Sequence, residues 1–408
     1  MATSDTDQKA PPLWQFVTVA DHYLPTASVG AISKNWFATW RKRLRSNDAD
    51  SEFTNKMSNL ETLPCERLER VAPAPDWRDA VVSLDGALEG WLTDERSDLP
   101  VVFLIGPPHG GCADILRRWA EQRQWRVLDP PAPEQILSGD PAWPGSPMAD
   151  GRPWVLPCLE RIYLRHATGL GQVRHFLQQV CRSALGRGII GCDSWAWAFL
   201  RRIWPPGRRA LALTLQSFDQ ERLTVYFQRL AGIPEQQLLL FRQSNNGAYV
   251  LPPPAGILDE SVARSDFLRR LAAHSRGIPG VARAIWRASL RTRPAADMTG
   301  ETGADDRNPP CQTIWIAPWD QIEKPALPGN AGRDQAFVLH ALLLHGGLTA
   351  ELLGCVVPLA PHHVVETLAL LQDAGLVEQA AEVWRVTPIG YPAVRGFLED
   401  NRYFSDDF

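Results

Sequence analysis

One strand–turn–helix segment constrains the fold more than any other part of the chain. An apolar run, Val101–Ile105, is followed by a turn rich in glycine and then by a helix-like pattern over Asp114–Arg123. Glycine tolerates the backbone conformations of a sharp turn, so a buried strand leads directly into a helix. Strand and helix signals keep alternating as far as residue 232, and this alternation predicts an α/β domain built on a parallel sheet.

The turn has the frame of a nucleotide-binding P-loop, whose pattern is G-x-x-x-x-G-K-[ST]. Gly106 and Gly111 stand at the glycine positions, but Cys112 replaces the lysine and Ala113 replaces the serine or threonine. In a working P-loop the lysine reaches the outer phosphates and the hydroxyl holds magnesium. We therefore expect a loop with the backbone shape of a phosphate-binding loop but without the side chains needed for hydrolysis. The candidate nucleotide-binding residues of the turn are Gly106, His109, Gly110, Gly111, Cys112 and Ala113.

Three interpretations of this turn remain open. It is a structural turn that binds no nucleotide, or it binds ATP or ADP without catalytic magnesium through backbone N–H groups at a helix N-terminus, or it hydrolyses ATP with substitute groups. Removing a single preorganised electrostatic group costs about 3 to 4 kcal/mol of catalysis. Because several such groups are missing together, we expect no catalytic residue, no metal and no obligatory cofactor.

Size and composition are those of a globular protein with several domains. A length of 408 residues predicts about two to four domains. The N-terminal residues do not form a signal peptide, and no apolar run reaches the roughly 18 residues of a membrane span. Seven scattered cysteines without a C-x-x-C pair indicate free thiols in a reducing compartment. We expect a cytoplasmic protein, with a peripheral place on the inner face of the membrane as an open alternative.

Breaks in periodicity and composition divide the chain. Residues 333–398 show three helical patterns, two short strands and a final helix, which is the pattern of a winged helix. Stretches rich in Pro, Gly, Asp and Asn mark connections. The expected organisation is an N-terminal partner-binding or extension region over 1–98, a degenerate P-loop core over 99–232, a helical lid over 233–293, a linker over 294–332, a winged-helix domain over 333–398 and a loose acidic tail over 399–408.

This layout resembles an AAA-type (AAA/STAND-like) ATPase module over residues 99–398, without pointing to a particular protein. The segment Trp154–Glu160 is similar to the Walker B strand, which normally ends in an acidic pair. Here Pro157 and Cys158 occupy that end, and Glu160 is the nearest acid. The resemblance implies an α/β P-loop (AAA-like) parallel sheet with helices on both faces, a helical lid and a C-terminal winged-helix domain.

Two further segments carry the same resemblance. Ile189–Ser194 is similar to the sensor strand of such modules, with Asp193 or Ser194 as its polar tip. Ser275–Arg283 resembles the start of the lid helix, where Arg283 stands in the place of a sensor arginine. The resemblance therefore adds Glu160, Ser194 and Arg283 to the candidate nucleotide-binding residues.

A short basic and aromatic stretch near the N-terminus is the candidate contact element. Aromatic residues recur there at helical spacing among basic residues, which is the pattern of an amphipathic helix. It suits an anionic membrane surface, an acidic groove of a partner protein or single-stranded nucleic acid, and it equally suits packing against the protein's own body. Its residues are Lys34, Trp36, Phe37, Trp40, Arg41, Lys42 and Arg43.

Charge argues against nucleic acid as the principal partner. Phosphate contacts supply most of the affinity for DNA, yet residues 333–408 hold four arginines and ten acids, a net charge of −6. The preferred hypothesis is a non-catalytic AAA-like scaffold or regulatory subunit, a pseudo-ATPase that acts through protein–protein contacts, with homo-oligomers also open. The alternatives are a slow or unconventional ATP-binding switch and a winged-helix regulator associated with nucleic acid.

Overall fold

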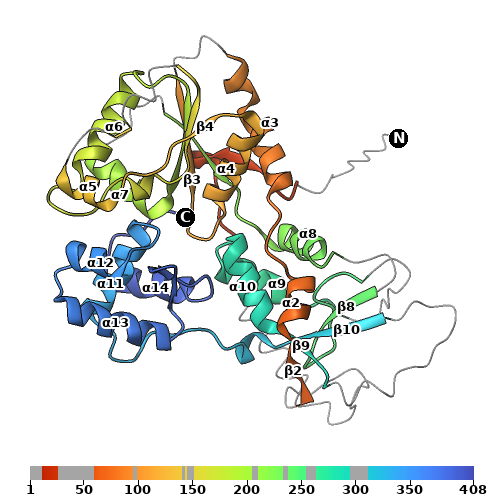
Figure 1. The fold of residues 1–408 in the computed structure, drawn as a ribbon. Coiled ribbons are helices and arrows are strands. Elements are labelled where there is room, and N and C mark those ends of the chain that lie inside the picture. The colour runs from red at the N-terminus through yellow and green to blue at the C-terminus, as the bar shows by residue number, and fades with distance from the viewer. Residues whose placement is uncertain are drawn as a thin grey trace.

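The computed structural model describes residues 12–25, 59–94, 99–139, 143–144, 151–204, 210–232, 238–253, 263–294 and 311–408. Figure 1 shows three parts, which are the sheet core, a smaller mixed unit and the C-terminal helices. The basic and aromatic stretch predicted over residues 34–45 lies outside the described residues.

The core is a parallel sheet with the P-loop strand near its centre. Its strand order is β1-β7-β3-β6-β5-β4, and all neighbours are parallel except the edge strand β1. The strands are β1 (Phe16–Thr18), β3 (Val101–Gly106), β4 (Arg126–Val127), β5 (Trp154–Leu156), β6 (Gly188–Asp193) and β7 (Leu211–Leu215). The parallel P-loop sheet expected from the sequence is confirmed.

Helices cover both faces of this sheet because β3 is apolar on both sides. Val102 and Leu104 belong to one hydrophobic cluster, whereas Val101, Phe103 and Ile105 belong to the other. This is the period-two alternation of a strand that is buried on both faces. The first cluster includes residues of α3 (Arg78–Thr93), α4 (Cys112–Arg123) and α8 (Gln220–Leu230), and the second includes residues of α6 (Gly171–Cys181) and α7 (Ser194–Ile203). The helix α5 (Pro133–Ser138) and the 3-10 helices η1 (Val19–Asp21) and η4 (Leu159–Arg161) lie in the connections.

The lid unit contains helices and an additional sheet. Its helices are α2 (Cys65–Val71), α9 (Phe267–His274) and α10 (Pro279–Ser289). Its sheet has the order β2-β9-β10-β8, with β2 (Glu61–Thr62), β8 (Leu238–Gln243), β9 (Leu290–Thr292) and β10 (Cys311–Ile316), and the 3-10 helix η6 (Trp319–Gln321) follows β10.

This sheet differs from the expected all-helical segment and linker. The apolar run of β8 pairs in parallel with β10, some seventy residues later along the chain. Such a long-range pairing leaves no local signature, and a short apolar run fits a helix or a strand equally well.

The winged helix is present as the sequence predicts. It consists of α11 (Arg333–Leu344), α12 (Ala350–Val356), α13 (Pro361–Asp373), β11 (Val377–Ala380), β12 (Val383–Val386) and α14 (Tyr391–Asp400). Thr349 caps α12 by accepting a hydrogen bond from the Leu352 N–H at 3.3 Å. Ala381 and Glu382 both have positive φ, at 47° and 69°, as a two-residue hairpin turn of type I′ requires.

The two ends of the described chain are built into the core, in contrast to the predicted extension region and loose tail. Trp14 is buried against Trp77, with ring centroids 5.4 Å apart, and β1 pairs with β7. Asp406 and Phe408 are each 4% exposed, and Figure 1 places this end between the core and the C-terminal helices. The acidic composition of the tail predicted that these residues are exposed to solvent, but contacts with other parts of the fold bury Asp406 and Phe408.

Among the described residues, no single helix is long and apolar enough to cross a membrane. The helices α12 and α13 reach that length and composition only when taken together, and they are bent by 119° relative to each other.

Candidate functional site

The turn between β3 and α4 adopts a tight conformation that other elements hold in place. Gly111 has a φ of +82°, and a Cβ atom at this position would lie 2.3 Å from the ring of Trp77. The Gly110 N–H donates to the Pro107 carbonyl oxygen at 3.0 Å, so one amide of the turn is already used internally. Gly111, one of the two glycines predicted from the P-loop frame, is therefore required here by geometry.

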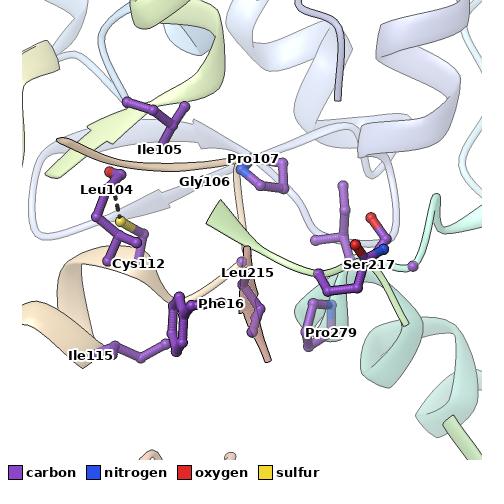
Figure 2. A pocket seen from close by; sticks show the side chains of 14 residues that line it. Phe16, Leu104, Ile105, Gly106, Pro107, Cys112, Ile115, Leu215, Ser217 and Pro279 are labelled. Carbon is purple, nitrogen blue, oxygen red and sulfur yellow. Dashed lines mark hydrogen bonds between the residues drawn. The ribbon is translucent and has the colours of Figure 1, made fainter. Parts of the chain in front are cut away.

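Cys112 occupies the position of the P-loop lysine, and its thiol is turned toward β3. Its thiol donates to the Leu104 carbonyl oxygen at 3.3 Å, back toward the strand, as Figure 2 shows. Burial, followed by the negative charge of Glu160, raises the pKa of this thiol well above its ordinary value. Position 112 is consequently neutral and faces inward. The small apolar cavity on this side, about 20 Å³, has room for little more than one water molecule.

A larger cavity of about 410 Å³ lies on the other side of the turn. Its walls are the turn, the start of α4, the ends of β5 and β6, the end of α11 with the residues after it, and part of β12. A Cβ atom at Gly346, two residues after the end of α11, would lie 3.2 Å from the Cγ atom of Glu160. The winged-helix domain therefore forms one wall of this cavity, which most of the predicted nucleotide-binding residues line.

His109 lies at the tip of the turn, between the lid and the winged helix. Its carbonyl oxygen accepts a hydrogen bond from the Gly280 N–H of α10 at 3.2 Å. Its ring is 6.0 Å from that of Tyr391 in α14. Burial, followed by the positive charge of Arg385, lowers the pKa of His109 to about 4, so the ring is neutral at physiological pH. The turn thus joins three parts of the fold.

Two acids lie at the ends of the central strands. The Asp193 N–H donates to Glu160 Oε2 at 3.0 Å, and the Asp193 carboxylate caps α7 by accepting from the Trp195 N–H at 2.9 Å. Burial is the main cause that raises the pKa of both carboxyl groups, and the charge of Glu160 adds to the effect on Asp193. Glu160 lines the cavity beside the turn, and its carboxylate is engaged with the backbone of Asp193.

Three predicted site residues do not line this cavity, namely Gly110, which lines the small cavity instead, Ser194 and Arg283. The Ser194 hydroxyl donates to the Asp406 carboxylate, so it serves the contact with the C-terminal segment. Arg283 donates to the carbonyl oxygens of Pro73 at 2.6 Å and Ala72 at 3.2 Å, so it fixes the segment that precedes α3. Backbone and carboxylate partners elsewhere hold both side chains, so the structure places them apart from the turn.

Three arginines that are not among the predicted site residues line the same cavity. Arg117 of α4, Arg161 of η4 and Arg385 of β12 all line it. Arg117 stands one turn inside a helix that follows a glycine-rich turn, and this spacing was an available signal. No local pattern connects Arg385 to the turn, because it lies some 270 residues further along the chain.

Comparisons with known proteins return distant structural similarities. No protein-family model and no curated protein match the sequence. The chain is similar to the Walker-type ATPase of Pyrococcus abyssi, with 12% identity, coverage of 80% of this chain and 97% of that one, and a TM-score of 0.31. The Aeropyrum pernix ORC2 protein in ADPNP and ADP complexes aligns with 13% identity, 81% and 94% coverage and a TM-score of 0.35. Cdc6p from Pyrobaculum aerophilum aligns with 12% identity, 83% and 99% coverage and a TM-score of 0.28. The AAA-like fold is evident from the chain's own parallel sheet, glycine-rich turn and winged helix.

Proposed function

We propose that this chain is a non-catalytic AAA-like module that acts as a scaffold or regulatory subunit through protein–protein contacts. The observation that carries the proposal is the Cys112 thiol, which stands at the lysine position and donates to the Leu104 carbonyl oxygen. A neutral side chain turned toward the strand supplies no positive charge to a γ-phosphate.

The residues around the turn support the same conclusion. Ala113 has no hydroxyl group to hold magnesium, and Pro157 follows β5 where a metal-binding aspartate would be needed. A residue that activates water must be ionised at the working pH, but burial raises the pKa of Glu160. Each of these features lowers the capacity for hydrolysis independently of the others.

The turn is also well suited to a structural role. It contacts Trp77 before α3, Gly280 in the lid and Tyr391 in the winged helix. A loop that packs against three elements stabilises their relative positions. The acidic winged helix, whose helix α13 carries neither lysine nor arginine, supports contact with protein over contact with nucleic acid.

ATP turnover by the purified full chain, with magnesium present, tests the proposal. We expect no hydrolysis above that of a mock preparation, and no change in the Glu160→Gln variant. The matched control is Glu366→Gln on the exposed face of α13. Magnesium-dependent hydrolysis that Glu160→Gln abolishes and Glu366→Gln preserves would overturn the proposal.

A second experiment addresses the scaffold role. Affinity purification with mass spectrometry should recover a protein partner in a fixed ratio to the chain, and analytical ultracentrifugation should report any homo-oligomer. A chain that remains monomeric and recovers no protein in a fixed ratio contradicts a role in protein–protein contacts.

A further inference from the structure

A further cavity, of about 320 Å³, lies in the core beside the helices α6 and α7. Both helices pack on the same side of the core sheet, as Figure 1 shows. Protein interiors are close-packed and contain few voids larger than a water molecule. A space of this volume is therefore a feature that the packing of these two helices against the sheet leaves open.

The walls of this cavity are apolar and partly aromatic. Phe103 of β3 and Trp197 of α7 lie side by side in its wall, with ring centroids 5.0 Å apart. Leu159, Leu177 and Leu200 line it as well, and all five side chains are buried. A volume of about 300 Å³ or more with such a lining is typical of sites that bind small apolar molecules.

The cavity opens at the edge of the sheet where the central strands begin. Among its lining residues, Leu99 before β3 and Ala210 before β7 are half-buried, whereas Cys181 at the end of α6 and Arg201 in the last turn of α7 are exposed. The glycine-rich turn follows the opposite end of β3. The opening of this cavity is therefore separate from the cavity beside the turn.

The charge around this opening is positive. Arg201 lines the cavity and donates to the Asp407 carboxylate at 3.1 Å. The Asp407 side chain is 83% exposed, so this ion pair contributes little, and the guanidinium group has further donors for a second carboxylate. There is no acid among the described residues that line the cavity. Residues 171–210, which contribute most of the lining, hold seven arginines and one aspartate. Such an opening attracts an anionic group.

We propose that this cavity binds a free medium-chain fatty acid, with the acyl chain against Phe103, Trp197 and Leu200 and the carboxylate at Arg201. An engineered cavity of about 150 Å³ takes up benzene, so a cavity of about 320 Å³ accommodates a chain of about ten carbon atoms. Burial of the chain supplies the affinity because it removes apolar surface from water. The positive opening selects an anionic head group over a neutral one. This inference goes beyond the proposed function, because it concerns a ligand site away from the turn.

Thermal unfolding of the full chain with sodium decanoate, kept below the concentration at which it forms micelles, tests the site. A ligand that binds only the folded state raises the unfolding temperature, and the rise grows with the logarithm of the ligand concentration. We expect this rise with decanoate. The same rise should need about tenfold more 1-decanol, which lacks the carboxylate. Sodium acetate should cause none, because its chain is too short to fill the cavity.

Two variants separate the contribution of the chain from that of the carboxylate. Val180→Phe places a larger apolar side chain in the cavity wall and should abolish the rise, and its control is Val82→Phe, because Val82 is 70% exposed on α3. Arg201→Gln should weaken decanoate binding about tenfold and leave decanol binding unchanged. Arg202→Gln is the control for this variant, since Arg202 is the next residue of α7 and lies over the Phe404 ring.

Alkylation of cysteines by iodoacetamide, followed by mass spectrometry, locates the ligand in the wild-type chain. Cys181 is exposed and lines the cavity, whereas Cys355 is exposed in α12 of the winged helix. Decanoate should slow the alkylation of Cys181 several-fold and leave that of Cys355 unchanged. This measurement does not depend on whether a variant folds.

Three results overturn this inference. The first is an unfolding temperature that decanoate leaves unchanged or raises equally in the wild type and Val180→Phe. The second is alkylation of Cys181 that decanoate does not slow. The third is binding to phosphatidylglycerol vesicles without any effect of free decanoate, which would assign the cavity to a membrane lipid.

Discussion

Replacement of Asp406 by asparagine is expected to loosen the contact between the winged helix and the P-loop core. The Asp406 carboxylate accepts hydrogen bonds from the Ser194 hydroxyl of α7 and from the Arg395 guanidinium of α14. Its side chain is fully buried, and that of Arg395 is only 5% exposed. The asparagine keeps the shape of the side chain but leaves a buried positive charge without its carboxylate.

The magnitude follows from the partners that Arg395 retains. Removing one member of a buried ion pair costs about 3 to 5 kcal/mol. Arg395 still contacts Glu399 at 2.9 Å and the Tyr391 hydroxyl at 3.3 Å, and Glu399 is 42% exposed. We therefore expect the lower end, about 3 kcal/mol, which is roughly a hundredfold increase in the population of the open form.

Hydrogen–deuterium exchange in α7 and α14 measures this opening directly. The matched control is Asp407→Asn, because the Asp407 side chain is 83% exposed and its ion pair with Arg201 contributes little to stability. We expect much faster exchange in both helices for Asp406→Asn and almost none of this effect for Asp407→Asn. Equal exchange in the two variants would refute the reasoning that the buried carboxylate holds the domains together.

Two further predictions concern the turn and the interface histidines. Gly111→Ala should lower the free energy of unfolding by more than about 2 kcal/mol, because the new Cβ atom would lie 2.3 Å from the Trp77 ring. The control is Gly139→Ala. Gly139 also has a positive φ but no atom within 4 Å of the added Cβ, so this variant should lose only about 1 kcal/mol. Similar losses in urea denaturation of the two variants would contradict a packed turn. Burial, as the main cause, lowers the pKa of His340 and His345 to about 4 from 6.5. The unfolded chain binds more protons in this range, so the free energy of unfolding should fall as the pH is lowered from 6.5 to 4, by up to about 1.4 kcal/mol per pH unit for each histidine. Urea denaturation across this range checks the slope, and a flat profile would disprove it.

Much of the secondary structure was predictable because its signals are local. The strand Val101–Gly106 and the helix Gln220–Leu230 follow from short-range periodicity, and the winged helix follows from the spacing of its helices and hairpin. The strands β8 and β10 were missed because their pairing joins segments that are far apart in the sequence. Periodicity within one segment contains no information about its partner strand.

The candidate site was only partly predictable, for a related reason. The frame of the turn and the position of Glu160 followed from the sequence, since both lie at the ends of predicted strands. The structure places Ser194 and Arg283 away from the turn, because the direction of each side chain depends on Asp406 or on the backbone near Pro73. A motif gives the place of a side chain along the chain, but its neighbours decide where the side chain points.

The sequence by itself determined that a glycine turn joins a buried strand to a helix and that the phosphate-binding lysine and hydroxyl are absent. Both properties belong to adjacent residues, so no tertiary contact can alter them. Only the tertiary structure decided that Arg385 enters the cavity of this turn and that Asp406 is buried between the core and the winged helix. These contacts join residues more than two hundred positions apart, and they form only when the apolar faces of separate domains pack together.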